Sequence, residues 1–382
     1  MVKNIHEIRD PIHVFVRLDS HERRVLDSPA FQRLRYVHQL GLSHLVYPGA
    51  THKRFEHSLG VMELASRVFD VVTNPDAVTD QVKELLPELK DRDAMRYWRR
   101  VLRMAALCHD IGHLPFSHTS EDLLPQGWSH ERITATIIQS KDMREIWESV
   151  TPPLRADDIV KLAIGPRVGA KIGVKEFSDW EAILAEIIVG DAFGVDRMDC
   201  LLRDSYHAGV AYGRFDHCRL IDTLRILPPP PMRKPESVED RKDERVEAED
   251  SKEVALGTEE GGLHSSESML LARYFMFMQV YSHPVRCIYD IFGGLEGLWR
   301  RRVLWFLLRL YPIPMVLVAL KIFKRLWSSY SRPGFLPNSN TIVVDVMWSA
   351  TMILIVLTTA LLILSVTGFS CLLPSGHRKR LP

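Results

Sequence analysis

The spacing of apolar residues predicts a mostly helical body. Between residues 58 and 72, apolar side chains recur at intervals of three and four, which is typical of an amphipathic helix: Val61, Leu64, Ala65, Val68 and Val72. The same periodicity predicts further helices over 96–111, 180–188, 195–209 and 266–291. Apolar–polar alternation is scarce and predicts strands only over 14–18 and 45–47. We therefore expect an all-α fold with minor β elements, in one domain spanning residues 1–291.

Two segments depart from this pattern. Residues 228–262 begin with four prolines and continue through charged residues with few apolar ones, so we predict a disordered insertion. Residues 346–368 form a run of 23 residues without one charge, which is long enough for a transmembrane helix. Residues 303–320 are interrupted by Arg309 and two prolines, and they suit an interfacial segment as well as a second span.

Charge separates the chain into two unlike parts. The net charge of +1 argues against a strongly basic nucleic-acid binder. Residues 298–382 carry eight Arg and three Lys against Asp345 alone, a net +10, which leaves −9 for the preceding 297 residues. Most of these basic residues precede the predicted span, which favours a cytoplasmic body and a C-terminal membrane anchor. The tail is either a genuine anchor or the product of a shifted reading frame or a fusion.

The cysteines and the first residues agree with a cytoplasmic location. The five cysteines are widely spaced and include no CxxC pair, which favours a reducing compartment over a disulfide framework. The N-terminus has no apolar run that could serve as a signal peptide.

A cluster of imidazoles and carboxylates carries the candidate chemistry. His109, Asp110, His113 and His118 fall within ten residues, and the two histidines at 109 and 113 would share a face if the helix continued. Arg54-Phe55-Glu56-His57 adds another histidine upstream. Downstream, three residues lie on one stripe of a predicted helix: Asp196, Cys200 and Asp204. Such imidazoles and carboxylates suit a divalent ion of Fe, Mn, Ni or Zn with positions left open for water and substrate.

These residues resemble a known family. The order His57, His109-Asp110 and Asp196 is similar to the H…HD…D signature of HD-domain metal-dependent phosphohydrolases. Further ordered segments resemble the deoxynucleoside-triphosphate triphosphohydrolases, the SAM-and-HD-domain type and its bacterial relatives: Asp10 to His13, Phe31 to Arg35, Tyr47 to Ala50, Trp128 to Glu131 and Asp196 to Asp204. The resemblance covers residues 5–290 without the acidic insertion, and it implies the helical HD fold.

Carried over to this sequence, the resemblance implies the following roles. The metal ligands would be His57, His109, Asp110 and Asp196, and Mg²⁺ could accompany the nucleotide. The catalytic histidines would be His118 and His130, with Glu131 orienting His130. The phosphates would contact Arg54, Arg197 and Arg273, while Gln39, Leu40 and Asp204 would hold the base and deoxyribose, with Tyr281 beside the sugar. Positions that bind a regulatory guanine nucleotide in relatives correspond to Asp27, Gln32 and Arg35.

Plainer roles stay open for several of these residues. Arg54 and Arg273 could be structural ion-pair residues, Leu40 and Tyr281 core residues, Asp27 a helix cap and Cys108 a buried helix residue. The sequence also departs from the family. Cys200 stands where the human-type enzymes have a tyrosine, Glu121 replaces an aspartate, and Arg9 replaces a nearby asparagine.

The resemblance implies a dGTPase-like enzyme that hydrolyses deoxynucleoside triphosphates to deoxynucleoside and triphosphate. Two alternatives remain: hydrolysis of a nucleotide monophosphate or another phosphoester, and nucleotide binding without turnover at the membrane. A homo-oligomer is left open.

Overall fold

The computed structural model describes residues 5–116, 120–121, 124–174, 176–228 and 254–287. The chain divides into two units, Met1–Arg302 and Val303–Pro382, and every described residue belongs to the first. The predicted tail at 298–382, including the predicted span at 346–368, therefore lies outside the described residues. Within the described ranges, no helix is both long enough and apolar enough to cross a membrane.

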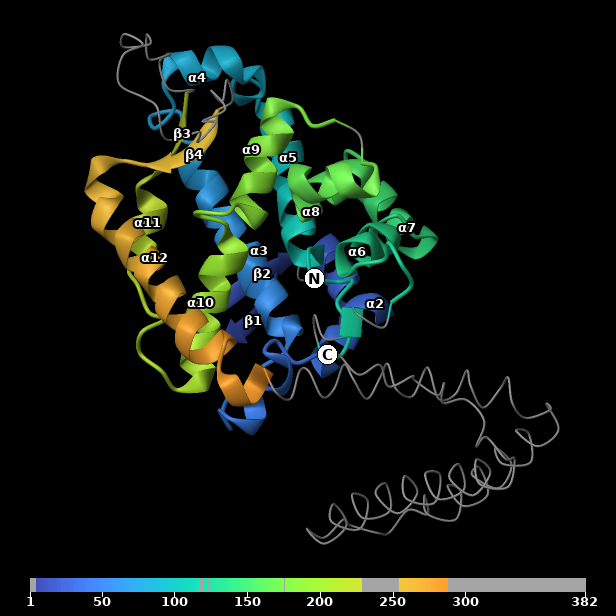
Figure 1. Ribbon diagram of the computed structural model, residues 1–382. Helices are drawn as coiled ribbons and strands as arrows, with labels where there is room; N and C mark the ends of the chain where they lie inside the picture. Colours follow the sequence, from blue (N-terminus) through green and yellow to red (C-terminus); the bar gives the residue numbers. More distant parts are fainter. Residues whose placement is uncertain (1–4, 117–119, 122–123, 175, 229–253, 288–382) are drawn as a thin grey trace, which may run out of the picture. The chain divides into compact units, whose positions relative to one another are not determined.

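The described chain is mostly helical, with two small sheets (Figure 1). The helices are α1 (Ser20–Leu26), α2 (Pro29–Gln32), α3 (Arg54–Val72), α4 (Asp80–Leu85), α5 (Arg92–Cys108), α6 (His130–Ile138), α7 (Lys141–Ser149), α8 (Ala156–Ile172), α9 (Asp179–Val189), α10 (Val195–Ala208), α11 (His217–Asp222) and α12 (Leu263–Met276). Short 3-10 helices cover Arg33–Tyr36, Gly41–Leu45, Pro87–Lys90 and Glu260–Gly262, and a π-helical turn covers Phe277–Tyr281.

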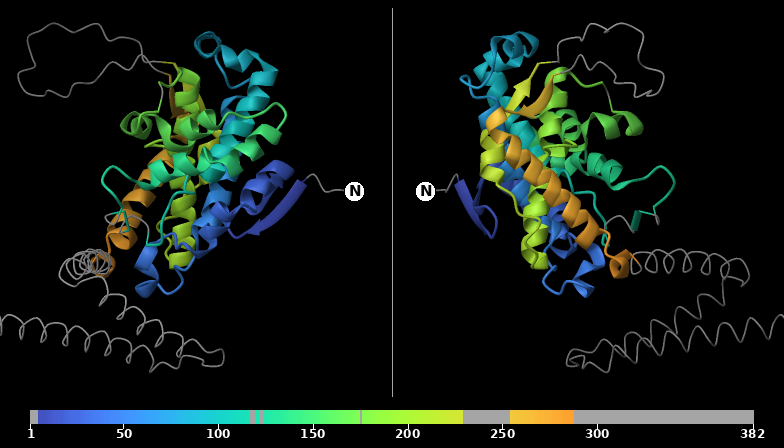
Figure 2. Two further views of the ribbon diagram at one scale, coloured as in Figure 1. Left: turned by 90° about the vertical axis from the view of Figure 1, so that its right-hand side faces the viewer. Right: turned by 60° about the vertical axis from the view of Figure 1, so that its left-hand side comes forward.

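Helix α3 is the centre of the core. It packs against α5, α9 and α10, while α8 packs against α5 and α9 (Figure 1). Helix α12 runs along α10 and α11 on the opposite side of α10 from the core helices (Figure 2). Because α3 has neighbours on several sides, most of its residues are buried, including the polar Arg54, His57 and Ser58. Buried charged or ionisable side chains are stable only where they are paired, and Arg54 and His57, which form part of the site, pair with Asp110 and Asp199.

Both sheets are antiparallel pairs. Strand β1 (Ile5–Asp10) pairs with β2 (Val14–Asp19), with Ile5 opposite Asp19. Asp19 then caps α1, accepting hydrogen bonds from the backbone of His21 and Glu22. Strand β3 (Leu224–Leu227) pairs with β4 (Ala255–Thr258), with Leu224 opposite Thr258.

Several predicted boundaries were wrong. Residues 45–47 form no strand: Gly41–Leu45 is a 3-10 helix with Gly41 at a φ of 52°, and the chain then turns through Tyr47. The helix predicted over 266–291 becomes a π-helical turn over Phe277–Tyr281 and is then interrupted at Ser282 and His283, before residues 284–287 are helical again. The helix predicted over 96–111 ends at Cys108.

The predicted disordered insertion was also wrong at its C-terminal end. Residues 229–253 lie outside the described residues, but Ala255–Thr258 form β4. Leu256 is buried in the core and donates its backbone N–H to Glu186 of α9. One buried leucine and a strand partner are thus enough to order a segment that the charged composition alone marks as solvated.

Candidate metal centre and active-site cavity

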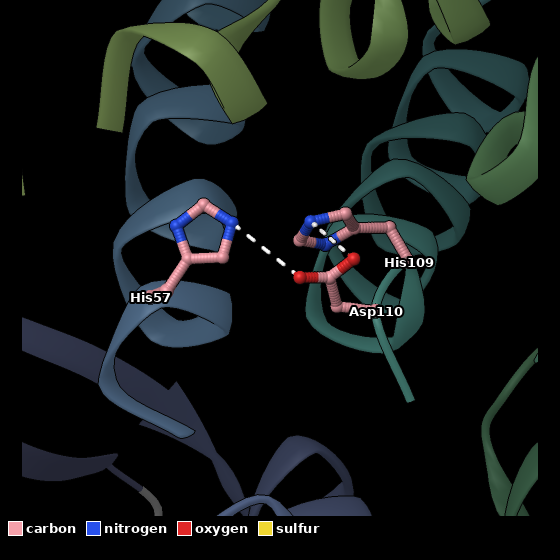
Figure 3. A group of neighbouring side chains, drawn as sticks. All are labelled: His57, His109 and Asp110. Carbon is pink, nitrogen blue, oxygen red and sulfur yellow. Dashed lines mark ion pairs between the residues drawn. The ribbon is translucent and has the colours of Figure 1, made fainter. Parts of the chain in front are cut away.

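His57 projects from α3 toward the end of α5, where Figure 3 shows it facing His109 and Asp110. Its Nδ1 lies 2.8 Å from Asp199 Oδ2, a contact in which the imidazole donates to the carboxylate. Its Nε2 lies 3.1 Å from Asp196 Oδ1 and 3.7 Å from Asp110 Oδ2. The Asp199 contact fixes the ring so that Nε2 is the atom presented to the site.

Asp199 belongs to a buried network that sequence reasoning missed. Arg203, one turn later in α10, donates to both Asp199 oxygens at 2.8 and 3.0 Å and to Asp10 at 2.8 Å. His13 approaches Asp199 Oδ1 at 2.7 Å. A Cβ on Gly60 of α3 would lie 2.0 Å from an Asp199 oxygen, so only glycine allows α10 this close. Two features of the sequence could have indicated this network: Asp199 follows Asp196 by three residues in the same helix, and Asp10 and His13 lie in a segment that resembles the family.

His109 and Asp110 follow the last residue of α5. His109 Nδ1 donates to the carbonyl of Ala106 at 2.8 Å, which turns Nε2 toward the site. Within the described part of the chain, this buried Nε2 has no hydrogen-bond partner, and it lies 3.6 Å from oxygens of both Asp110 and Asp196. The turn is held from outside by Arg33, which donates to the carbonyls of Ile111 and His113 at 2.5 Å each.

The two carboxylates stay ionised. Burial alone would raise the pKa of Asp110, but Arg54, His109 and His113 outweigh it and hold that pKa well below the usual range. Burial likewise opposes ionisation of Asp196, but the neighbouring imidazoles of His109 and His57 lower its pKa. The site therefore presents two ionised carboxylates and two imidazole nitrogens within a small volume.

These residues fit a divalent ion. The oxygen and nitrogen atoms of His57, His109 and Asp110 converge within 4.8 Å of one another, and the unpartnered His109 Nε2 is a buried ligand atom of the kind that a metal satisfies. Two imidazoles with carboxylates suit Zn, Mn, Fe or Ni. His113 does not share a helical face with His109, because α5 has ended, but its Nε2 still lies 3.2 Å from Asp110 Oδ1.

A cavity of about 590 Å³ opens from this cluster. The predicted site residues among its lining are Gln39, Leu40, Arg54, His109, Asp110, His130, Glu131, Asp196, Arg197, Asp204, Arg273 and Tyr281. Cys200 and Arg286 also line it, and Arg286 was not anticipated. The volume lies within the range typical of small-ligand sites.

Asp204 anchors the part of the cavity away from the carboxylates. Its two oxygens are bound by His52 Nε2 and by the Tyr281 hydroxyl, both at 2.7 Å. His52 is buried and stacks on His207 with ring centroids 4.5 Å apart. Tyr281 thus contacts a polar site residue and is more than a core residue.

The arginines of the cavity have distinct settings. Arg54 is buried and pairs with Asp110, so the structural role left open for it is observed. Arg197 donates to the Gly190 carbonyl and to Asp191 Oδ1, both at 2.7 Å. Arg273 donates to the Asp191 carbonyl at 2.9 Å. The loop after α9 therefore brings two guanidinium groups from α10 and α12 to one rim.

His130 stands at the start of α6, where Ser129 is the N-cap. Its Nδ1 lies 2.5 Å from Glu121 Oε1 and 3.4 Å from Glu131 Oε2, so Glu121 makes the shorter contact. Its ring stacks on His113 with centroids 3.9 Å apart. His118 lies outside the described residues.

The three residues expected for regulation do not line the cavity. Asp27 is a helix cap, the C-cap of α1, and pairs with Arg23 at 2.8 Å, while the N-cap of α2 is Ser28. Gln32 donates to the Leu26 carbonyl and accepts from Arg35, whose guanidinium covers the Phe55 ring. Cys108 is a fully buried helix residue, as its plainer role predicts.

Comparison with known proteins agrees with this geometry. Residues 54–170 match the HD domain, and residues 246–292 match the HD associated region. The chain carries an HD domain. The mostly helical fold predicted for it is confirmed, and the metal-dependent chemistry of HD domains agrees with the cluster of His57, His109 and Asp110.

Several known proteins are similar to this chain in sequence. An uncharacterized protein of Methanocaldococcus jannaschii is 34% identical over 283 residues, 74% of this chain and 47% of that protein. The deoxynucleoside triphosphate triphosphohydrolase SAMHD1 of Gallus gallus is 35% identical over 237 residues, 57% of this chain and 36% of that protein. The human SAMHD1 is 32% identical over 249 residues, 59% of this chain and 37% of that protein.

A solved structure supports the fold directly. A hypothetical protein from Aquifex aeolicus has a TM-score of 0.57 at 35% identity, covering 78% of this chain and 65% of that one. The chain spans about half the length or less of the curated relatives it matches. The chain is thus an HD-domain protein that resembles the phosphohydrolases of the SAMHD1 type, as the sequence predicts.

Proposed function

We propose that this HD-domain protein hydrolyses deoxynucleoside triphosphates to deoxynucleoside and triphosphate with a bound divalent metal. The observation that carries the proposal is a cavity lined by His109, Asp110 and Asp196 of the metal cluster, by the arginine rim and by the Asp204–Tyr281 pair. Similarity to proteins named deoxynucleoside triphosphate triphosphohydrolases supports this substrate class.

The metal would be held by His57, His109, Asp110 and Asp196. When bound, such an ion supplies an acidified water and neutralises charge on phosphate oxygens. The Asp199 contact fixes the ring of His57, and Arg54 and the neighbouring histidines keep Asp110 ionised, so both side chains present ligand atoms to the site.

His130 is proposed to handle the proton. A phosphoester leaving group departs as an alkoxide and needs a proton, which a histidine can donate. Contacts with Glu121 and Glu131 orient the His130 ring from its Nδ1 side, and Nε2 is proposed as the atom that transfers the proton. His118 is proposed as a second catalytic histidine.

The remaining cavity residues are proposed to bind the nucleotide. Guanidinium groups suit phosphate oxygens, which assigns the phosphates to Arg54, Arg197 and Arg273. Gln39 and Leu40 would hold the base, and Asp204 the deoxyribose. The phenol hydroxyl of Tyr281 donates to Asp204 and holds the ring beside the proposed deoxyribose site. There the ring would occupy the place of a ribose 2′-hydroxyl.

Two further proposals concern a regulatory nucleotide site and a membrane anchor. Asp27, Gln32 and Arg35 form an exposed or half-buried group that could take a regulatory nucleotide between copies of the chain. The predicted anchor at 346–368 would hold the catalytic domain at the cytoplasmic face of a membrane.

The test is product analysis with the full chain, Mn²⁺ and each deoxynucleoside triphosphate in turn. We expect intact triphosphate and deoxynucleoside from the native protein, and loss of both bound metal and activity in His109→Ala and Asp110→Ala. His264→Ala is the matched control, because that histidine is exposed and pairs only with Glu267 among the described residues. Release of monophosphate products, or turnover of monophosphates alone, would favour the alternative phosphoester substrate.

A further inference from the structure

Cys200 lies one helical turn after Asp196 in α10, beside the proposed metal ligands. Its Sγ is 3.7 Å from Asp196 Oδ1 and 3.9 Å from His57 Nε2. These three side chains form a second group whose ligand atoms all lie within 4.8 Å of one another. The thiol therefore borders the space that the proposed metal would occupy.

We propose that Cys200 is an additional, sulfur ligand of the metal, so that the centre prefers a thiophilic ion such as Zn²⁺, Co²⁺ or Fe²⁺ over Mg²⁺. The inference rests on the proposed metal-dependent function and specifies its donor set. Thiolate ligands select softer divalent ions, whereas Mg²⁺ is held by oxygen ligands.

The distances fit a shared coordination shell. Metal–sulfur and metal–nitrogen bonds of about 2.3 and 2.1 Å separate the two ligand atoms by about 3.1 Å at the 90° angle of a five- or six-coordinate centre and by about 3.6 Å at a tetrahedral angle. The observed separations of Sγ from the nitrogen and oxygen ligands, 3.9 and 3.7 Å, lie just above this range.

Two further contacts point to a ligand at this place. The buried His109 Nε2, without a hydrogen-bond partner among the described residues, faces the same space from the α5 side and lies 3.6 Å from Asp196 Oδ1. Gln39 Nε2 donates to Cys200 Sγ at 3.3 Å. A donor aimed at the sulfur is the kind of neighbour that orients a metal ligand.

Coordination replaces the S–H proton of Cys200, which passes to solvent, and no electron is transferred. Metal binding is coupled to this deprotonation, as for other thiol ligands. The sulfur would then occupy a position that an oxygen ligand or water takes in an all-nitrogen-and-oxygen site. This links the departure at position 200 to metal choice.

The test is the absorption spectrum of the full chain loaded with Co²⁺, with bound metal measured in the same sample. We expect a near-ultraviolet thiolate-to-cobalt charge-transfer band in the native protein and in Cys218→Ser, whose thiol is exposed in α11. The band should be absent in both Cys200→Ser and Cys200→Ala, and Zn²⁺ affinity should fall at least about tenfold while Mg²⁺ affinity is unchanged. Circular dichroism checks that each variant is folded.

Two outcomes would overturn the inference and leave the proposed function standing. One is Co²⁺ bound to the native protein without the charge-transfer band, and the other is an equal band in folded Cys200→Ser. If the native protein binds no divalent ion at all, the metal-dependent function itself fails, and the sulfur ligand fails with it.

Discussion

Replacing Asp199 with asparagine should weaken metal binding, although Asp199 is not itself a proposed ligand. Asp199 accepts from His57 Nδ1 and holds the ring so that Nε2 faces the site. Asparagine keeps the shape but removes the negative charge that stabilises a donating Nδ1–H. His57 would then be a weaker ligand with a less fixed ring.

Two quantities should change in this variant, the metal affinity and the folding stability. Loss of a partner that orients a ligand typically costs 10–100-fold in metal affinity, about 1.4–2.7 kcal/mol. The buried ion pair with Arg203 is also broken, and removing one partner of a buried pair costs about 3–5 kcal/mol of folding stability. Arg203 keeps Asp10 at 2.8 Å, so we expect a loss near the lower figure. For a chain of this size that corresponds to a fall in Tm of about 4–6 °C.

The assay is metal affinity by competition with a chelator, with thermal unfolding measured on the same samples. The matched control is Asp70→Asn, which breaks an ion pair with Arg99 whose side chains are 55% and 39% exposed. An exposed pair is worth about 0–1 kcal/mol, so this variant should keep its metal affinity and nearly all of its stability. A folded Asp199→Asn protein with native metal affinity would refute the orienting role, even if its Tm fell.

Three more predictions address catalysis, pH and the tail. His130→Ala should keep metal and nucleotide binding while turnover falls on the order of 10²–10⁴-fold, and loss of metal instead would make His130 a ligand. Burial and the 2.6 Å hydrogen bond to Asp158 raise the pKa of Tyr97. The contribution of Tyr97 to folding stability is therefore complete below its unfolded-state pKa of about 10 and is lost as the pH rises above that value. The Tm of Tyr97→Phe should then depend less on pH above about 10 than the Tm of the native protein. An equal dependence of the two Tm values on pH would contradict this prediction. If residues 346–368 span a membrane, fractionation should recover the full chain in the membrane fraction. Recovery in the soluble fraction would contradict the proposed anchor.

The parts of the fold that could be predicted are those where periodicity and burial agree. Helices α3 and α10 have regular apolar stripes, and the structure has them within a few residues of the predicted ranges. The stripe of Asp196, Cys200 and Asp204 lies on one side of α10 and lines the cavity, as the spacing requires. Local pattern suffices here because each helix buries the face that its own sequence marks.

The network behind the metal site could not be predicted in the same way. Asp199 and Arg203 are both fully buried, although aspartate and arginine are ordinarily surface residues. Their partners, Asp10 and His13, are nearly two hundred positions away in the chain. Periodicity carries no information on such long-range pairs, so only the packing of the β1–β2 hairpin near α10 reveals them.

The balance of buried charge explains why a divalent ion suits this centre. Four carboxylates lie in the His57 network and the metal cluster, and two arginines are paired with them: Asp10, Asp110, Asp196 and Asp199 against Arg54 and Arg203. Arg203 pairs with two of the carboxylates and Arg54 with one, while the contacts of Asp196 among the described residues are with His57, His109 and Cys200. The resulting excess of two negative charges would be costly in a buried site unless it were neutralised. Burial opposes protonation of both imidazoles, but Cys200, Asp196 and Asp199 raise the pKa of His57, and Asp110 and Asp196 raise that of His109. A divalent ion held by these residues would neutralise the excess of two negative charges, and it would be coordinated by both imidazoles in their neutral form.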